Sequence, residues 1–275
     1  MRAAESGEKM ANLTVGRENS TAVELFYQDR GAGAPVVLVH GYPLAGESWE
    51  KQIAALLEEG HRVVTYDRRG SGRSSRPASG YDWDTLASDL NVLMTTLDLH
   101  QAAVVGHSLG TGDVLRYLST YGSRRVSRAV LIAPLATRPS EVRLPELIGP
   151  RNEDRYAELS RVIDDYYNVD VLLGTRVSPE VVRYSWDAGV DAAPEVATHF
   201  STALQSDFRP DLERIDLPGM IISAGADRIL PPDSGRLDFG RLPMLKSILI
   251  PNAPHGLLWT HAAEVNAALL GFIDD

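Results

Sequence analysis

Short apolar runs that alternate with longer amphipathic stretches are the feature that most limits how this chain can fold. The runs are continuous rather than alternating, which is typical of strands buried on both faces of a sheet. They predict strands at 36–39, 62–66, 102–105, 129–132, 220–222 and 247–250. The stretches between them predict helices at 46–60, 82–98, 109–121, 231–242 and 260–274. We therefore expect an α/β fold with a mostly parallel central sheet flanked by helices on both faces.

Two further segments depart from this rhythm. Residues 11–17 and 22–29 alternate polar and apolar side chains, which indicates an antiparallel hairpin at the sheet edge. Residues 135–210 contain no strand-like run and are rich in charged and aromatic residues, so they predict inserted helices. Because open parallel sheets bind ligands at the carboxyl ends of their strands, we interpret the insertion as a helical cap over a site rather than a remote elaboration.

The domain prediction follows from these segments. We expect one core domain made of residues 11–134 and 211–275, with a helical cap at 135–210. The first ten residues mix charged and small side chains without an apolar stretch, so they lack the pattern of a signal peptide. We expect residues 1–10 to be a disordered leader.

The composition excludes several classes of function. The 275 residues include no cysteine, which rules out disulfides, thiol nucleophiles and cysteine-bound metals. The net charge of −10 argues against nucleic-acid binding, which needs a basic face. No apolar run approaches the roughly 18–20 residues that span a bilayer. Without a signal peptide or a membrane-spanning run, we expect a cytoplasmic protein. No metal-ligand spacing and no phosphate-binding glycine motif is present, so we predict that it uses no metal and no organic cofactor.

A candidate nucleophile lies between two glycines. The motif Gly106-His107-Ser108-Leu109-Gly110 follows a predicted strand and precedes a predicted helix. Small residues on both sides permit a sharp turn that holds the serine hydroxyl out at the strand end, beside a helix N-terminus. The alternative is that Ser108 only caps the helix. We predict that Ser108 is a nucleophile.

A serine nucleophile needs a base, and the base needs an orienting acid. Among the seven histidines, His255 follows the last predicted strand, and His261 near the start of the final helix is the alternative. Asp227 directly follows the strand around 220–222, whereas Asp233 lies in a Pro-Pro-Asp turn that is typical of a helix cap. We predict His255 as the base and Asp227 as the acid.

An oxyanion formed at Ser108 requires two N–H donors. Leu109, the residue after the nucleophile, would supply one donor. Tyr42, in the loop after the strand 36–39, would supply the other, because the next residue is Pro43. We also predict that the side chains of Tyr42 and Trp259 line the substrate pocket. The turn 67–74 is interpreted as structural.

These motifs together resemble those of the cofactor-free bacterial haloperoxidases, a group of α/β-hydrolases also described as aryl esterases and perhydrolases. The resemblance runs from residue 11 to 273 and is carried by segments 40–44, 66–70, 110–113, 227–228 and 253–261. It implies the α/β-hydrolase fold, the chain order Ser108, Asp227, His255 for the triad, and the N–H groups of Tyr42 and Leu109 as oxyanion donors. It also implies a homo-oligomer, a trimer or a dimer.

The chain departs from the group at three places. His107 and Leu109 stand where members often carry phenylalanine and methionine, and Tyr42 stands where phenylalanine is common. Residues 134–160 match poorly, so the resemblance describes the acyl pocket least well.

The functional prediction is a serine hydrolase that acts on small carboxylic esters or lactones through an acyl-enzyme. Attack by peroxide in place of water would give a peracid, which can oxidise halide, so perhydrolase and haloperoxidase activity would be side reactions. A lyase, decarboxylase or cyclase on the same fold is the alternative. A ligand-binding receptor that retains the triad is a third hypothesis.

Overall fold

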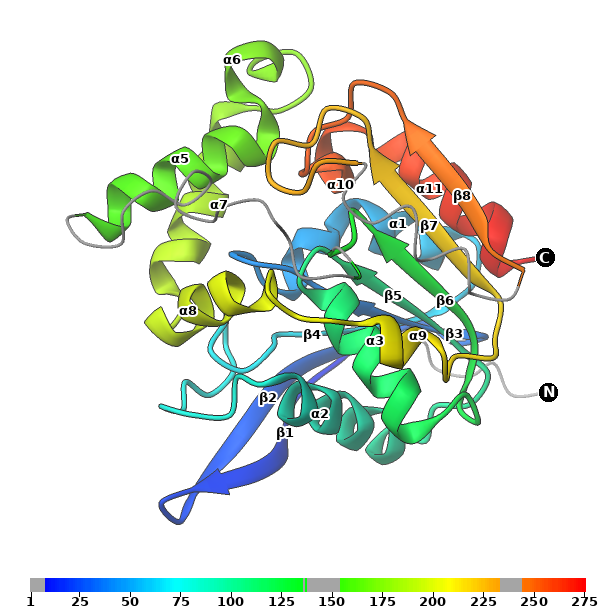
Figure 1. Cartoon of the computed structure of the whole chain (residues 1–275). Helices are drawn as coiled ribbons and strands as arrows, with labels where there is room; N and C mark the ends of the chain where they lie inside the picture. The colour runs from blue at the N-terminus through cyan, green and yellow to red at the C-terminus, as the bar shows by residue number, and fades with distance from the viewer. Residues whose placement is uncertain (1–7, 136, 138–153, 233–243) are drawn as a thin grey trace.

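The predicted strand and helix alternation folds into one eight-stranded sheet (Figure 1). The computed structural model describes residues 8–135, 137, 154–232 and 244–275. The strand order across the sheet is β1-β2-β4-β3-β5-β6-β7-β8. The strands are β1 Lys9–Glu18, β2 Thr21–Arg30, β3 Pro35–Val39, β4 Arg62–Tyr66, β5 Ala102–His107, β6 Val126–Ile132, β7 Gly219–Ala224 and β8 Lys246–Ile250. All six predicted buried strands and the predicted edge hairpin are confirmed.

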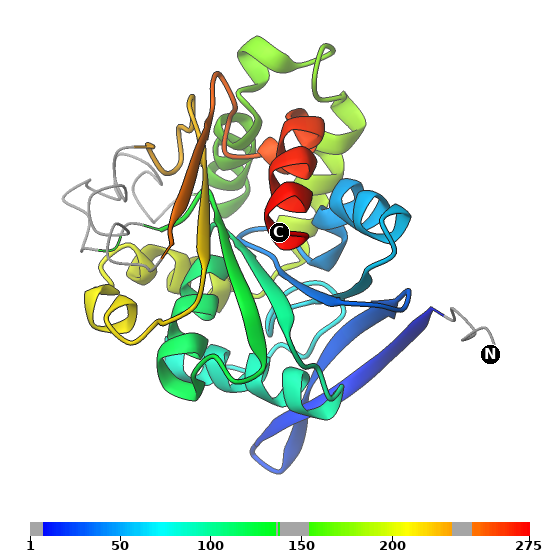
Figure 2. The same ribbon diagram turned by 90° about the vertical axis from the view of Figure 1, so that its right-hand side faces the viewer.

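The continuous apolar runs are explained by helices on both sides of the sheet, which Figure 2 shows edge-on. Successive strand residues point to opposite faces. Val36 and Leu38 belong to the hydrophobic cluster under α1 (Glu50–Glu58) and α11 (Ala262–Ile273), whereas Val37 and Val39 belong to the cluster under α2 (Trp83–Thr96) and α3 (Gly110–Tyr121). The covering elements are η1 Gly46–Trp49, α1 Glu50–Glu58, α2 Trp83–Thr96, α3 Gly110–Tyr121, α9 Arg209–Leu212, α10 Leu257–Thr260 and α11 Ala262–Ile273. The predicted helix 231–242 lies almost entirely outside the described residues.

The sheet is mostly parallel, as predicted. Strands β3 to β8 pair in parallel, and β2 pairs antiparallel with both β1 and β4. The loops that follow β3, β4, β5, β7 and β8 therefore leave the sheet at the same edge. Every predicted site residue except Trp259 lies in or beside one of these loops.

In the described residues, the insertion between β6 and β7 consists mainly of helices joined by turns. It contains α5 Arg155–Tyr167, α6 Val169–Leu172, α7 Pro179–Asp191 and α8 Pro194–Ala203. These helices gather beyond the strand ends rather than on a face of the sheet (Figure 1). They pack through their own apolar cluster, which includes Leu159, Ile163, Tyr166 and Tyr167. The arrangement agrees with a separate helical layer over the carboxyl edge of the sheet.

Two boundary predictions need correction. Lys9 and Met10 belong to β1, where they pair with Asp29 and Gln28, so the predicted disordered leader is wrong for these two residues. Backbone pairing along the hairpin orders them despite their polar surroundings in the sequence. Residues 1–7 lie outside the described residues. The predicted boundary between residues 210 and 211 falls inside α9, a short helix that packs against α3 of the core.

No helix in the described part of the chain is both long and apolar enough to cross a membrane.

Candidate active site

Ser108 lies at a strained turn between β5 and α3. Its φ angle is +53°, a left-handed value that costs free energy for a residue with a side chain, and the residue is almost fully buried. Its backbone N–H donates to the carbonyl of Ile132 at 2.9 Å. A Cβ atom on Gly106 would lie 2.7 Å from the carbonyl oxygen of Gly110, and one on Gly110 would lie 2.3 Å from that of Val39. Both glycines are therefore required by close backbone contact, as the sequence argument expected.

The loop after β3 passes directly beside Ser108. A Cβ atom on Gly41 would lie 2.7 Å from Cβ of Ser108, so a glycine is required here too. Tyr42 follows Gly41 in this loop. Neither the N–H of Tyr42 nor that of Leu109 donates a hydrogen bond to another described residue. Both groups thus keep a free donor next to the serine.

His255 and Asp227 form a buried pair. Nδ1 of His255 lies 2.7 Å from Oδ2 of Asp227, and each side chain is 1% exposed. The other carboxylate oxygen accepts from the N–H groups of Ile229 and Leu230 at 2.8 and 2.7 Å. Because an ionised carboxylate only accepts, Nδ1 of His255 is the donor in this contact, which leaves Nε2 free to accept when the ring is neutral. This is the arrangement that a histidine base requires.

The hydroxyl oxygen of Ser108 and Nε2 of His255 are both buried, and neither has a hydrogen-bond partner among the described residues. These are the two atoms that a serine–histidine relay joins. The structure therefore forms the acid–base pair and leaves the serine–base hydrogen bond unmade. Hydrogen bonds of this kind are often long without substrate and shorten when the reactants bind.

Two other histidines support the loops around Ser108. His40 contacts the carbonyl of Gly41 through Nδ1 at 2.9 Å, and its Nε2 accepts from the N–H of Arg68 at 2.8 Å. One neutral tautomer satisfies both contacts. Burial and the neighbouring Arg68 lower the pKa of His40 to about 3. His107 contacts the carbonyl of His255 at 3.1 Å, and burial holds its pKa well below the usual range. Both histidines hold neighbouring loops together through their ring nitrogens.

The turn after β4 is structural, as the sequence analysis inferred. The carboxylate of Asp67 accepts from the N–H groups of Gly46 and Arg73, each at 2.8 Å. The next residue, Arg68, forms a bidentate pair with Asp113 of α3 at 2.7 and 2.8 Å. The side chains of this pair are 3% and 1% exposed. The turn therefore fixes the helix that follows Ser108.

The alternative base occupies a different environment. His261 lies at the N-cap position of α11, where its Nδ1 is 2.9 Å from the hydroxyl of Thr260. Burial lowers the pKa of His261. Asp227 pairs with His255 instead. Asp233, the alternative acid, lies outside the described residues.

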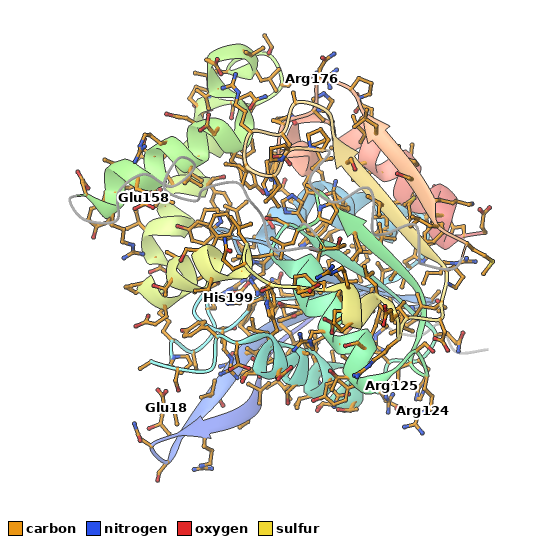
Figure 3. All side chains as sticks on the ribbon, in the orientation of Figure 1. Glu18, Arg124, Arg125, Glu158, Arg176 and His199 are labelled. Carbon is orange, nitrogen blue, oxygen red and sulfur yellow. The ribbon has the colours of Figure 1, made fainter. Side chains whose placement is uncertain are left out.

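The two predicted pocket residues have different surroundings. The ring of Tyr42 stacks on Phe200 of α8 with centroids 5.1 Å apart. Burial raises the pKa of Tyr42 to about 12, and Glu158 of α5, which Figure 3 labels, adds to the shift. Tyr42 thus lies between the core and the inserted helices.

Trp259 lines a cavity of about 540 Å³ between α1 and α7, together with Ile53, Leu57, Val181 and Tyr184. The ammonium of Lys51 lies 5.0 Å from the centre of the Trp259 ring. The cavity lining contains no member of the predicted triad, so these contacts do not support the predicted pocket role of Trp259.

Two residues near the site were missed by the sequence analysis. The ring of Tyr166 lies against that of His255, with centroids 5.1 Å apart. The side-chain amide of Asn168 donates to the carbonyl of Ala226 at 3.0 Å. The only signal for them in the sequence is the aromatic pair Tyr166-Tyr167, which by itself indicates a buried helix face. Among the described residues, no group of three or more metal-ligating side chains lies together.

The family is decided by comparison with known proteins. A family model described as the alpha/beta hydrolase fold matches residues 34–262. The chain belongs to this family. In this fold the ends of the parallel strands meet at one edge of the sheet, and Ser108, the loop of Tyr42 and the His255–Asp227 pair all follow such strand ends.

Relatives and solved structures are similar to this α/β-hydrolase over nearly its whole length. A protein of Synechocystis sp. with the provisional name non-heme chloroperoxidase is 47% identical, over 96% of this chain and 100% of its own. A bifunctional esterase/perhydrolase of Acinetobacter calcoaceticus is 34% identical, over 91% of this chain and 96% of its own. The crystal structure of a bromoperoxidase from Bacillus anthracis superposes with a TM-score of 0.90 and 38% identity, covering 97% of this chain and 100% of that one.

Proposed function

We propose that this α/β-hydrolase is a serine esterase for small carboxylic esters or lactones, with perhydrolase activity when peroxide replaces water. Ser108, Asp227 and His255 are its triad. The observation that carries the proposal is the buried hydrogen bond between His255 and Asp227. It leaves Nε2 of His255 without a partner among the described residues, and His255 follows a strand at the same edge of the sheet as the strained Ser108. Names of relatives that include esterase, perhydrolase and chloroperoxidase support the same chemistry.

The proposed reaction has two halves. The hydroxyl oxygen of Ser108 attacks the ester carbonyl, while Nε2 of His255 takes the hydroxyl proton and Asp227 holds the ring in the required tautomer. The N–H groups of Tyr42 and Leu109 donate to the oxyanion. His255 then gives its proton to the leaving alcohol, and the acyl-enzyme remains on Ser108.

In the second half, His255 takes a proton from water, and the resulting nucleophile attacks the acyl carbonyl. Collapse of this intermediate breaks the bond to Ser108, returns the proton to its oxygen and releases the carboxylic acid. Hydrogen peroxide enters by the same steps and releases a peracid. The basic chemistry is acyl transfer in both cases.

We further propose that the inserted helices α5 to α8 act as a cap that forms one side of the substrate pocket. The stacking of Tyr42 on Phe200 of α8 supports this role, because Tyr42 belongs to the proposed oxyanion loop. A homo-oligomeric state and a cytoplasmic location stay predictions. Light scattering of the purified protein would test the first.

The test uses Ser108→Ala with p-nitrophenyl acetate. We expect turnover to fall at least on the order of 10³-fold, because no other group supplies the acylated oxygen. Circular dichroism would check that the variant is folded. Undiminished hydrolysis by folded Ser108→Ala would overturn the proposal.

Two additional measurements separate the related hypotheses. A fluorophosphonate should label the wild type at Ser108, and labelling without steady ester turnover would favour a lyase or cyclase instead. Slow, near-single turnover with stabilisation by a bound ligand would favour a receptor. Adding peroxide during turnover should yield peracid, which a halide-bromination assay detects.

A further inference from the structure

We propose that the C-terminal end of α5, together with the turn that leads into α6, positions both the acid and the base of the triad. We call residues 165–170 the α5 clamp. In this clamp Tyr166 positions His255, and Asn168 positions the loop that carries Asp227. The inference rests on the proposed function, since it assigns positioning residues to that same site.

The first contact of the α5 clamp is with the base. The Tyr166 ring stands at 77° to the His255 ring, with centroids 5.1 Å apart, and both residues are at most 2% exposed. The carbonyl of Tyr166 also accepts from the N–H of Gly256 at 2.6 Å. The clamp therefore holds the His255 loop by its backbone and places an aromatic wall against the imidazole. Such a wall limits rotation of the ring away from Ser108.

The second contact is with the acid. Asn168 is 5% exposed, and its amide donates to the carbonyl of Ala226, the residue before Asp227, at 3.0 Å. On the other side of the acid, Arg228 makes a bidentate pair with Asp170 at 2.8 and 3.0 Å. The clamp thus touches the chain immediately before and immediately after Asp227.

The backbone of Asn168 explains how one segment reaches both loops. Its φ of +49° and ψ of +55° lie in the left-handed region, and they end α5 and redirect the chain into α6. Asparagine tolerates this conformation better than most residues do, because its short polar side chain can bond locally. Here the side chain bonds across to Ala226 instead. The turn that ends the helix therefore also supplies the contact with the acid loop.

These contacts matter because the acid and the base come from different strands. Asp227 follows β7 and His255 follows β8, and the two loops are joined directly by a hydrogen bond from Ala226 N–H to the carbonyl of Ala253 at 2.8 Å. The α5 clamp adds a third element that contacts both loops. Since a misplacement of about 1 Å can cost about 10²-fold in rate, a contact that fixes their relative position affects catalysis.

The base-side test compares three variants. Tyr166→Leu removes the aromatic wall, and Tyr166→Phe retains it. Tyr167→Phe is the matched control, because Tyr167 belongs to the same apolar cluster as Tyr166. This variant loses the hydrogen bond of Tyr167 to Ser185 at 2.8 Å but leaves the aromatic wall intact. We expect Tyr166→Leu to lower kcat for p-nitrophenyl acetate on the order of 10- to 100-fold, with KM changed by less than about threefold. Both phenylalanine variants should keep the wild-type kcat.

The acid-side test uses Asn168→Gly. Glycine adopts the left-handed conformation without strain, so the variant removes the contact with Ala226 and leaves the turn intact. We expect kcat to fall about tenfold, since the acid loop is still held by its hydrogen bond to the His255 loop. A second readout is the low-field proton resonance of the His255 Nδ1–H in NMR spectra. It should be sharp in the wild type and in Tyr166→Phe, and broadened in Tyr166→Leu and Asn168→Gly.

The outcomes distinguish positioning from packing. Wild-type kcat and a sharp resonance in folded Tyr166→Leu and Asn168→Gly would overturn the inference. An equal loss of kcat in Tyr167→Phe would also overturn it, because the effect would then follow the stability of the cluster. If Tyr166→Leu does not fold, Asn168→Gly decides the outcome by both readouts. Retained hydrolysis in Ser108→Ala instead contradicts the proposed function, and the resonance still tests the clamp.

Discussion

The two halves of the proposed triad are held in different ways. Ser108 is fixed by backbone contacts within its own motif, such as the carbonyl of Gly110 against Gly106, and by the buried pair of Arg68 and Asp113. The acid and the base are contacted by residues of the α5 clamp, about 60 to 90 residues earlier in the chain. A short sequence motif can therefore locate Ser108, because the contacts that require its glycines lie inside the motif. Side-chain contacts from an insertion leave no motif.

The largest expected effect is on the acid–base half, with Asp227→Asn. The N–H groups of Ile229 and Leu230 need an acceptor, so the amide oxygen should stay against them and the NH₂ group should face Nδ1 of His255. That arrangement imposes the wrong histidine tautomer. We expect kcat to fall on the order of 10³- to 10⁴-fold, the scale known for a triad with this defect. Steady-state kinetics measure the loss, and a fall of less than tenfold would contradict the tautomer argument.

The next expected effect is on the free energy of unfolding. The Arg68–Asp113 pair beside Ser108 is buried, whereas the Arg228–Asp170 pair beside Asp227 is exposed. Asp113→Asn leaves the charge of Arg68 buried without a partner, which should lower the free energy of unfolding by about 3–5 kcal/mol. Asp170→Asn is the control. The side chains of Asp170 and Arg228 are 63% and 39% exposed, so their pair should contribute little to the free energy of unfolding. Urea denaturation measures both. Equal effects would mean that burial does not decide the strength of these pairs.

A smaller effect is expected from filling a glycine beside the serine. In Gly110→Ala the new Cβ meets the carbonyl of Val39 at 2.3 Å, so the backbone at Ser108 must move. We expect kcat to fall on the order of 10- to 100-fold. Gly271→Ala is the control, because nothing lies within 4 Å of its added Cβ inside α11. This control should keep wild-type activity and gain about 0.5–1 kcal/mol of stability. A normal kcat in Gly110→Ala would show that the turn can relax.

The last effect, which is absent at neutral pH, is the pH dependence of stability on the side of the inserted helices. Burial and Arg68 lower the pKa of His199, on α8, to about 3 (Figure 3). As the pH falls below about 6.5, His199 therefore binds a proton in the unfolded chain but not in the folded chain. The stabilisation is complete above pH 6.5 and is lost as the pH falls from 6.5 towards 3, by about 1.4 kcal/mol per pH unit for this residue. His199→Gln should reduce the slope by about one proton, measured by urea denaturation between pH 4 and 6. An unchanged slope would mean that His199 titrates normally.

Much of the fold was predictable because strands buried on both faces need continuous apolar runs. The six runs became β3 to β8, and the alternating segments became the β1–β2 hairpin. The predictions that were wrong concern the boundaries of segments. Lys9 and Met10 are ordered by pairing with β2, and α9 crosses the predicted domain boundary. Both outcomes depend on contacts between distant segments, which a local pattern does not encode.

The sequence by itself determined the sheet and identified the candidates Ser108, Asp227 and His255, because glycine spacing, strand ends and chain order are local properties. Only the tertiary structure decided that His255 pairs with Asp227, that Trp259 lines a separate cavity, and that Tyr166 and Asn168 contact the acid and base loops. The physical reason is range. The glycine spacing of the serine motif reflects contacts inside the motif, such as Gly106 against the carbonyl of Gly110, whereas a buried side chain contacts whatever the fold brings within about 4 Å of it.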